Sequence, residues 1–174
     1  MSIDLFERSL TMSRKLYFVL AIAVVFIFSF TTFATAGEKI KAHGTGVTTK
    51  YEMMEVGDVD GHVIMISETK HVYFNETTGE KYSGTGHNIM EGNIKTGAGW
   101  WLKGYGVSNY PNGDKSFRSL EGTPVGKGHW KGTWKVTGGT GKFKGATGGG
   151  TWDSKTLEQG VSYSEVEGEI EYQQ

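Results

Sequence analysis

The chain of 174 residues contains no cysteine, only two prolines and, beyond residue 36, one arginine, Arg118. Without cysteine there are no disulfide bonds, no thiolate metal ligands and no thiol nucleophile, so a domain of this size has to be held together by its hydrophobic core. The formal net charge is −1, and the basic residues form no run or stripe. This argues against binding to phosphate backbones, and we expect no nucleic-acid partner.

Only one long hydrophobic run is present, and it lies near the N-terminus. Arg14 and Lys15 precede an uncharged stretch that ends in Ala34-Thr35-Ala36. A signal peptidase recognises small residues at two positions, which Ala34 and Ala36 occupy here. The alternative is an uncleaved membrane anchor, because about 20 apolar residues can span a bilayer.

We therefore predict that residues 1–36 are a signal peptide, with Met12 as a possible true start, and that residues 37–174 form one domain. After cleavage the protein would be secreted or periplasmic, without a membrane-bound part. A chain of this length is sufficient for one ordinary domain and too short for two.

Glycine and aromatic residues are abundant in the second part of the chain. All 27 glycines and all five tryptophans lie beyond residue 36, so glycine makes up about a fifth of that part, against a usual share of about 7%. Disordered chains lack such bulky residues. Glycines spaced by two, as in Gly44/Gly46 and Gly104/Gly106, allow strong coiling of a strand and let aromatic rings lie over bare backbone. This favours a tightly curved barrel over a flat sandwich.

The remaining sequence reads as strands separated by turns, and no segment has a helical period over more than one turn. Asn112-Gly113 is typical of a tight hairpin turn. The eight predicted strands are 39–56, 62–74, 81–92, 96–110, 115–123, 129–137, 142–152 and 160–172. Eight antiparallel strands can close into a barrel whose interior is filled by side chains or holds one small ligand.

Two of these segments indicate which face is buried. From His129 onward, Trp130 and Trp134 alternate with polar residues. The last segment alternates apolar residues with four glutamates, at positions 165, 167, 169 and 171. Four unpaired carboxylates cannot share a small dry interior, so the glutamates are predicted to face water.

The run Gly138-Gly139-Thr140-Gly141-Lys142-Phe143-Lys144-Gly145-Ala146-Thr147-Gly148 resembles a β-hairpin of allene oxide cyclases and plant dirigent proteins. The resemblance implies a single eight-stranded antiparallel β-barrel of the allene oxide cyclase or calycin kind. It also implies structural roles here, with Gly139 and Gly141 forming the turn and Phe143 packing inward.

Relatives with this hairpin bind apolar small molecules inside the barrel, and some steer their cyclisation or coupling. Together with the signal peptide predicted for residues 1–36, the resemblance implies an exported barrel that binds a small hydrophobic or aromatic ligand in its lumen. Two alternatives stay open: a cofactor-independent isomerase or cyclase, and a packed barrel with a structural or interaction role in the cell envelope. An open lumen would exclude the packed barrel, and a desolvated carboxylate beside it would favour an enzyme.

The residues proposed for such a lumen are aromatic or ionisable side chains on the predicted strands, namely Glu68, His87, Trp100, Glu121 and Trp134. Glu68 shares its parity with Ile64 and Ile66, which we expect to face inward. The five histidines lack the spacing of metal ligands, and Glu68 and His71 fall on opposite faces of a strand. No metal and no cofactor are expected.

Overall fold

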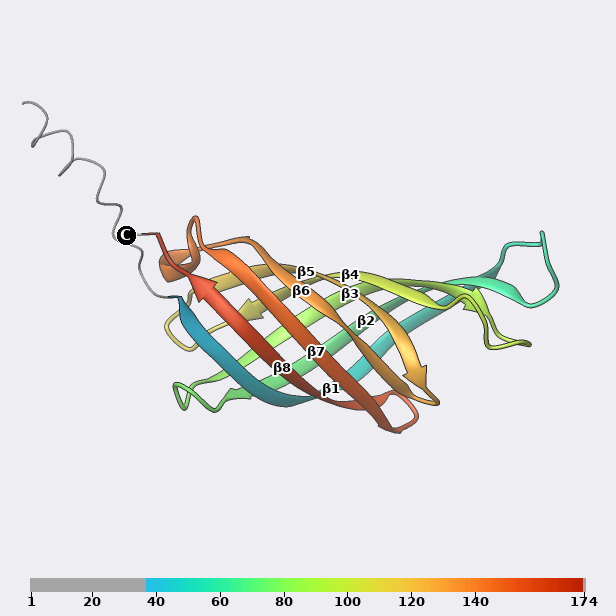
Figure 1. Cartoon of the computed structure of the whole chain (residues 1–174), viewed down its shortest axis with the longest axis horizontal. Coiled ribbons are helices and arrows are strands. Elements are labelled where there is room, and N and C mark those ends of the chain that lie inside the picture. The colour runs from blue at the N-terminus through green and yellow to red at the C-terminus, as the bar shows by residue number, and fades with distance from the viewer. Residues whose placement is uncertain (1–36, 174) are drawn as a thin grey trace, which may run out of the picture. The chain divides into compact units, whose positions relative to one another are not determined.

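The strands pair with one another in chain order and close into a barrel. In the computed structural model, which describes residues 37–173, each antiparallel strand is hydrogen-bonded to the next, and β8 pairs with β1 (Figure 1). The strands are β1 (Glu38–Glu55), β2 (His62–Asn75), β3 (Lys81–Asn93), β4 (Trp101–Asn109), β5 (Lys115–Gly126), β6 (His129–Gly139), β7 (Thr147–Glu158) and β8 (Val161–Glu171). The prediction of an all-β, eight-stranded antiparallel barrel is confirmed. The predicted signal peptide lies outside the described residues.

Two strands begin later than predicted, because side chains and glycines turn the backbone first. β4 begins at Trp101 instead of residue 96, since the side-chain oxygen of Asn93 accepts hydrogen bonds from the backbone N–H of Lys95 and Thr96. β7 begins at Thr147 instead of residue 142, because a short 3-10 turn, η1 (Gly141–Phe143), precedes it.

A β-bulge in β1 changes which residues face inward. The pairing of β1 with β2 shifts between Thr48 and Lys50. Before the bulge the even-numbered Ala42 is buried, whereas after it the odd-numbered Tyr51 lies opposite the buried Ser67. A bulge bends its strand and increases the local twist. The β1–β2 and β3–β4 hairpins extend beyond the other strands at one end of the barrel (Figure 1).

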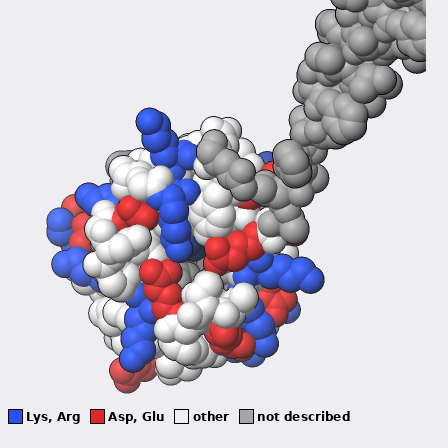
Figure 2. Space-filling model, turned by 90° about the vertical axis from the view of Figure 1, so that its left-hand side faces the viewer, with Lys and Arg blue, Asp and Glu red and all other residues white. Residues whose placement is uncertain are grey.

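The outer surface carries charges of both signs. Along β8, Val166 and Ile170 are buried, whereas the four glutamates between and beside them are exposed, as predicted. Lys39 and Lys41 of β1 lie opposite Glu169 and Glu167 in the strand register. Figure 2 shows basic and acidic side chains interspersed over one end of the barrel. Opposite charges in cross-strand positions stabilise a sheet modestly.

The core lies at one end of the barrel, where a row of aromatic rings packs with aliphatic side chains such as Ile40, Val166 and Ile170. We call Tyr73, Tyr82, Tyr110, Phe143 and Tyr172 the aromatic stack. Successive ring centroids are 5.5, 5.0, 4.6 and 5.6 Å apart in that order. Such pairs stabilise a fold beyond the area that they bury.

The glycine hairpin closes this end. Gly139 ends β6, and Gly141 begins η1 with a φ of 54°. A side chain at Gly141 would overlap the carboxylate of Asp114, which accepts a hydrogen bond from the backbone N–H of Lys142 at 3.1 Å. η1 thereby directs Phe143, which is 1% exposed, into the barrel.

We expect Phe143→Ala to lower the free energy of unfolding by about 3–5 kcal/mol, because it leaves a cavity in the centre of the aromatic stack. Phe117 is the matched control: it is 37% exposed on the outer face, and Phe117→Ala should cost less than about 1 kcal/mol. Urea unfolding followed by tryptophan fluorescence measures both. Equal losses would show that the hairpin does not anchor the core.

Candidate functional site

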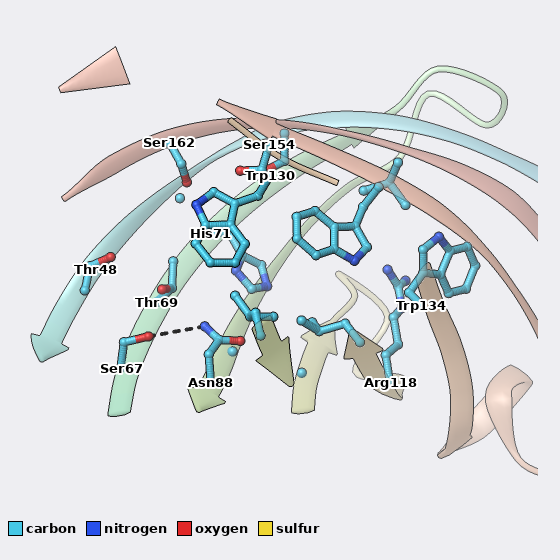
Figure 3. A pocket seen from close by; sticks show the side chains of 18 of the residues that line it. Thr48, Ser67, Thr69, His71, Asn88, Arg118, Trp130, Trp134, Ser154 and Ser162 are labelled. Atoms are coloured by element: carbon cyan, nitrogen blue, oxygen red, sulfur yellow. Dashed lines mark hydrogen bonds between the residues drawn. The ribbon is translucent and has the colours of Figure 1, made fainter. Parts of the chain in front are cut away.

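The other half of the barrel is hollow. A cavity of about 270 Å³ lies inside the strands, next to the aromatic stack. The side chains that line it include Thr48, Ser67, Thr69, His71, Asn88, Met90, Leu102, Arg118, Leu120, Trp130, Trp134, Trp152, Ser154, Thr156, Ser162 and Ser164 (Figure 3). We call this cavity the lumen.

One side of the lumen wall is polar. β1, β2, β7 and β8 contribute seven serine and threonine side chains, and β3 contributes Asn88. The seven are Thr48, Ser67, Thr69, Ser154, Thr156, Ser162 and Ser164. The side-chain amide of Asn88 donates to Ser67 at 3.4 Å, the hydrogen bond drawn in Figure 3, and Ser164 donates to Ser154 at 2.9 Å. The hydroxyl groups offer donors and acceptors to a bound molecule.

The opposite side of the wall is apolar. It is formed by β3 to β7, with Met90, Leu102, Leu120 and the indole rings of Trp130, Trp134 and Trp152. A binding site of this kind, with a broad apolar surface and a limited set of placed polar groups, is typical of small-molecule pockets.

Glycines of neighbouring strands make room for the tryptophans. A side chain at Gly132 would overlap the ring of Trp152, and one at Gly168 would overlap the ring of Trp134. The indole N–H of Trp152 donates to the backbone carbonyl of Thr133 at 3.1 Å. The rings are therefore fixed against bare backbone.

The lumen opens at the end away from the aromatic stack. A second pocket at that end shares Met90 and Trp130 with the lumen and adds Met65, Trp100 and Pro124. Trp100 packs edge-on against Trp130, with 6.4 Å between ring centroids. These two rings border the entrance.

The inner end of the lumen carries a buried positive charge, the guanidinium of Arg118. Its Nη2 donates to the hydroxyl of Tyr110 at 3.0 Å, and its central carbon lies 5.6 Å from the ring centre of Tyr82 and 5.2 Å from that of Trp134. Burial alone would lower the pKa of Arg118, but the neighbouring phenols of Tyr82, Tyr110 and Tyr73 outweigh it and the pKa is raised. The group is therefore charged at neutral pH.

His71 is the second ionisable group in the lumen. Burial, together with the positive charge of Arg118, lowers the pKa of His71 to about 4. Its imidazole packs against the edge of Tyr73, with 5.1 Å between ring centroids. His71 is thus a neutral side chain at physiological pH, which can donate one hydrogen bond and accept one.

The structure places two of the five proposed site residues at the lumen. Trp134 is 4% exposed and lines it directly. Trp100 precedes β4, covers Gly92 and lies at the entrance.

The other three, Glu68, His87 and Glu121, lie on the outer face, so their expected position in the lumen is corrected. Glu68 accepts a hydrogen bond from Thr49 at 2.7 Å and lies 3.4 Å from His87. Glu121 lies 3.7 Å from Lys103 and is solvent-exposed. In β2 the odd-numbered side chains face the lumen. The even-numbered side chains face outward, and among them the apolar Ile66 is 54% exposed.

Arg118 and His71 were not among the sequence-derived candidates. One available signal for Arg118 was its parity, because it shares a face of β5 with the apolar Leu120. A second signal was the composition, because Arg118 is the one arginine beyond residue 36.

Within residues 37–173, no group of three or more His, Asp or Glu side chains is arranged to hold a metal ion. In the same part of the chain, no helix has the length and apolar character needed to cross a bilayer. Among the described residues that line the lumen, none is an aspartate or glutamate.

Comparisons with known proteins give little beyond the fold. No protein-family model matches the chain, and no curated protein matches it. Eight chains of solved structures match, among them a pterocarpan synthase dirigent protein with a TM-score of 0.49 and 10% sequence identity. The match covers 79% of this chain and 86% of that one. A dirigent protein is thus among the solved structures to which this barrel is similar.

We expect the imidazole of His71 to remain neutral on acidification until about pH 4. An unfolded histidine takes up its proton near about pH 6.5, so the unfolded state binds more protons between these values and the stability falls as the pH falls through this window. A pH titration of the imidazole carbon signals by NMR measures this pKa. A midpoint near the ordinary value would show that His71 is hydrated.

Proposed function

We propose that this protein binds a small molecule with an apolar or aromatic body inside its barrel. The observation that carries the proposal is the lumen itself, a preformed cavity that is closed at one end by the aromatic stack and bordered at the other by Trp100 and Trp130. Its volume of about 270 Å³ is slightly below the range of drug-sized sites, about 300–1,000 Å³, which suits a small ligand.

The lumen favours binding over the two alternatives. A barrel with only a structural role would fill its interior, as barrels of eight strands can do with side chains alone. An isomerase that works by proton transfer needs a group whose pKa suits that transfer near neutral pH. The described lining has no carboxylate, and the pKa of His71 lies well below that range.

We further propose that the protein acts after export, as a secreted or periplasmic protein. The support is the order of features in residues 1–36, with two basic residues, an apolar run and a small-residue cleavage site.

Binding can be measured with N-phenyl-1-naphthylamine, an uncharged aromatic probe whose fluorescence increases in apolar surroundings. We expect saturable binding to the wild-type protein and at least about tenfold weaker binding to Gly106→Leu. Gly106 lines the lumen, and an added Cβ would meet only one atom within 4 Å, at 3.9 Å, so a leucine can occupy the cavity without displacing backbone.

The matched control is Lys103→Leu, which adds the same side chain to the same strand on the exposed outer face. It should leave probe binding unchanged. Binding that survives in Gly106→Leu, or that is lost in both variants, would contradict a site in the lumen.

Export is tested by the mass of the chain recovered from the extracellular or periplasmic fraction of the producing cells. We expect the mass of residues 37–174. A chain that retains the apolar run from Leu16 to Ala36 would support the membrane-anchor alternative instead.

A further inference from the structure

Among residues 37–173, the guanidinium of Arg118 has no carboxylate as a counterion. Within this part of the chain its Nη2 donates to the phenol oxygen of Tyr110, and its Nε has no hydrogen-bond partner. No carboxylate belongs to the lining around it in the described part of the chain. In Figure 3 the guanidinium lies beside Trp134, at the side of the lumen away from Thr48 and Ser67.

An isolated charge in such a place is costly. Removing an ion from water is far more unfavourable than burying a neutral polar group, and proteins normally compensate it with an opposite charge. The rings of Tyr82 and Trp134 attract the cation through their faces but carry no net negative charge. The phenols of Tyr73 and Tyr82 stay protonated at neutral pH, because burial raises the pKa of both.

We propose that Arg118 binds the carboxylate of the ligand, so that the lumen selects small monoanionic organic acids with an apolar or aromatic body. This inference rests on the proposed function, because it names the chemical class of the molecule that the lumen takes. A planar guanidinium matches a carboxylate in shape, and hydrogen bonds between the two charged groups are stronger than those between neutral groups.

The single positive charge in the described lining of the lumen matches a ligand that carries one negative charge. Arg118 contributes the one positive charge among the described lining residues, because His71 is neutral at physiological pH. A carboxylic acid is already ionised at that pH, whereas a phenol would first have to lose its proton. A doubly charged phosphate would leave one negative charge buried without compensation.

The walls then orient the rest of the molecule. With the carboxylate on Arg118 at the inner end, the body of the ligand lies between Leu120, Trp130 and Trp152 on the apolar side and the hydroxyl groups on the other. Hydroxyl substituents on one edge of the ligand would find partners such as Thr69 and Ser162.

The experiment compares two probes of nearly equal shape, 2-naphthoate and 2-naphthamide, as competitors of N-phenyl-1-naphthylamine at about pH 7, where a carboxylic acid is ionised. We expect the wild-type protein to bind 2-naphthoate at least about tenfold more tightly than 2-naphthamide. In Arg118→Met, which has a similar length and no charge, this preference should disappear while 2-naphthamide binds as before.

Lys142→Met is the matched control. The Lys142 ammonium lies 5.3 Å from the ring centre of Tyr110 and 5.2 Å from that of Phe143, so it contacts the same aromatic stack but does not line the lumen. Its loss should leave the preference for 2-naphthoate intact.

The inference is overturned if wild-type protein binds both competitors equally, a comparison that needs no variant to fold. It is also overturned if the preference persists in Arg118→Met or is lost in Lys142→Met. Equal binding of both competitors would leave the proposed lumen function standing, whereas failure of the uncharged probe to bind at all would remove the function and the inference together.

Discussion

The packing of one guanidinium on a stack of neutral aromatic rings is the feature on which the rest of this barrel depends. The aromatic stack fills one end of the barrel, and Arg118 lies on Tyr82 and Trp134 where the stack meets the lumen. The rings exclude water from one side of the charge, and the lumen leaves the other side open to a ligand. A barrel filled along its whole length would have no place for this charge.

The position of the lumen follows from how small residues are distributed. Gly132 and Gly168 allow Trp152 and Trp134 to lie against the wall, so that the rings line the cavity instead of filling it. Across the barrel, the serines and threonines of β1, β2, β7 and β8 are too short to reach the middle. One wall is therefore apolar and one polar, and a charge marks the inner end. This arrangement orients a ligand as well as enclosing it.

Turn chemistry and alternation were sufficient to predict the eight strands and the solvated glutamates of β8, because these are local signals. The closed barrel was predicted from the paired glycines and from the resemblance of the glycine hairpin. The parity of β2 was not predictable from hydrophobicity. Ile66 faces water, whereas the polar Ser67 faces inward, because the inner face of this strand borders a cavity instead of a packed core. For the same reason Glu68, which shares its parity with Ile66, was wrongly expected to face the lumen. The bulge in β1, which reverses the parity after Thr48, leaves no clear mark in the sequence.

The central claim is that the lumen holds a small organic acid on Arg118, and native mass spectrometry of protein isolated from its own producing cells tests it most directly. We predict a complex that carries one small molecule, which is released on activation as a singly charged anion. Protein with Arg118→Met should show the bare polypeptide mass. A retained molecule without an acidic group would contradict binding of a carboxylate by Arg118. A molecule that the Arg118→Met variant retains equally well would contradict it too.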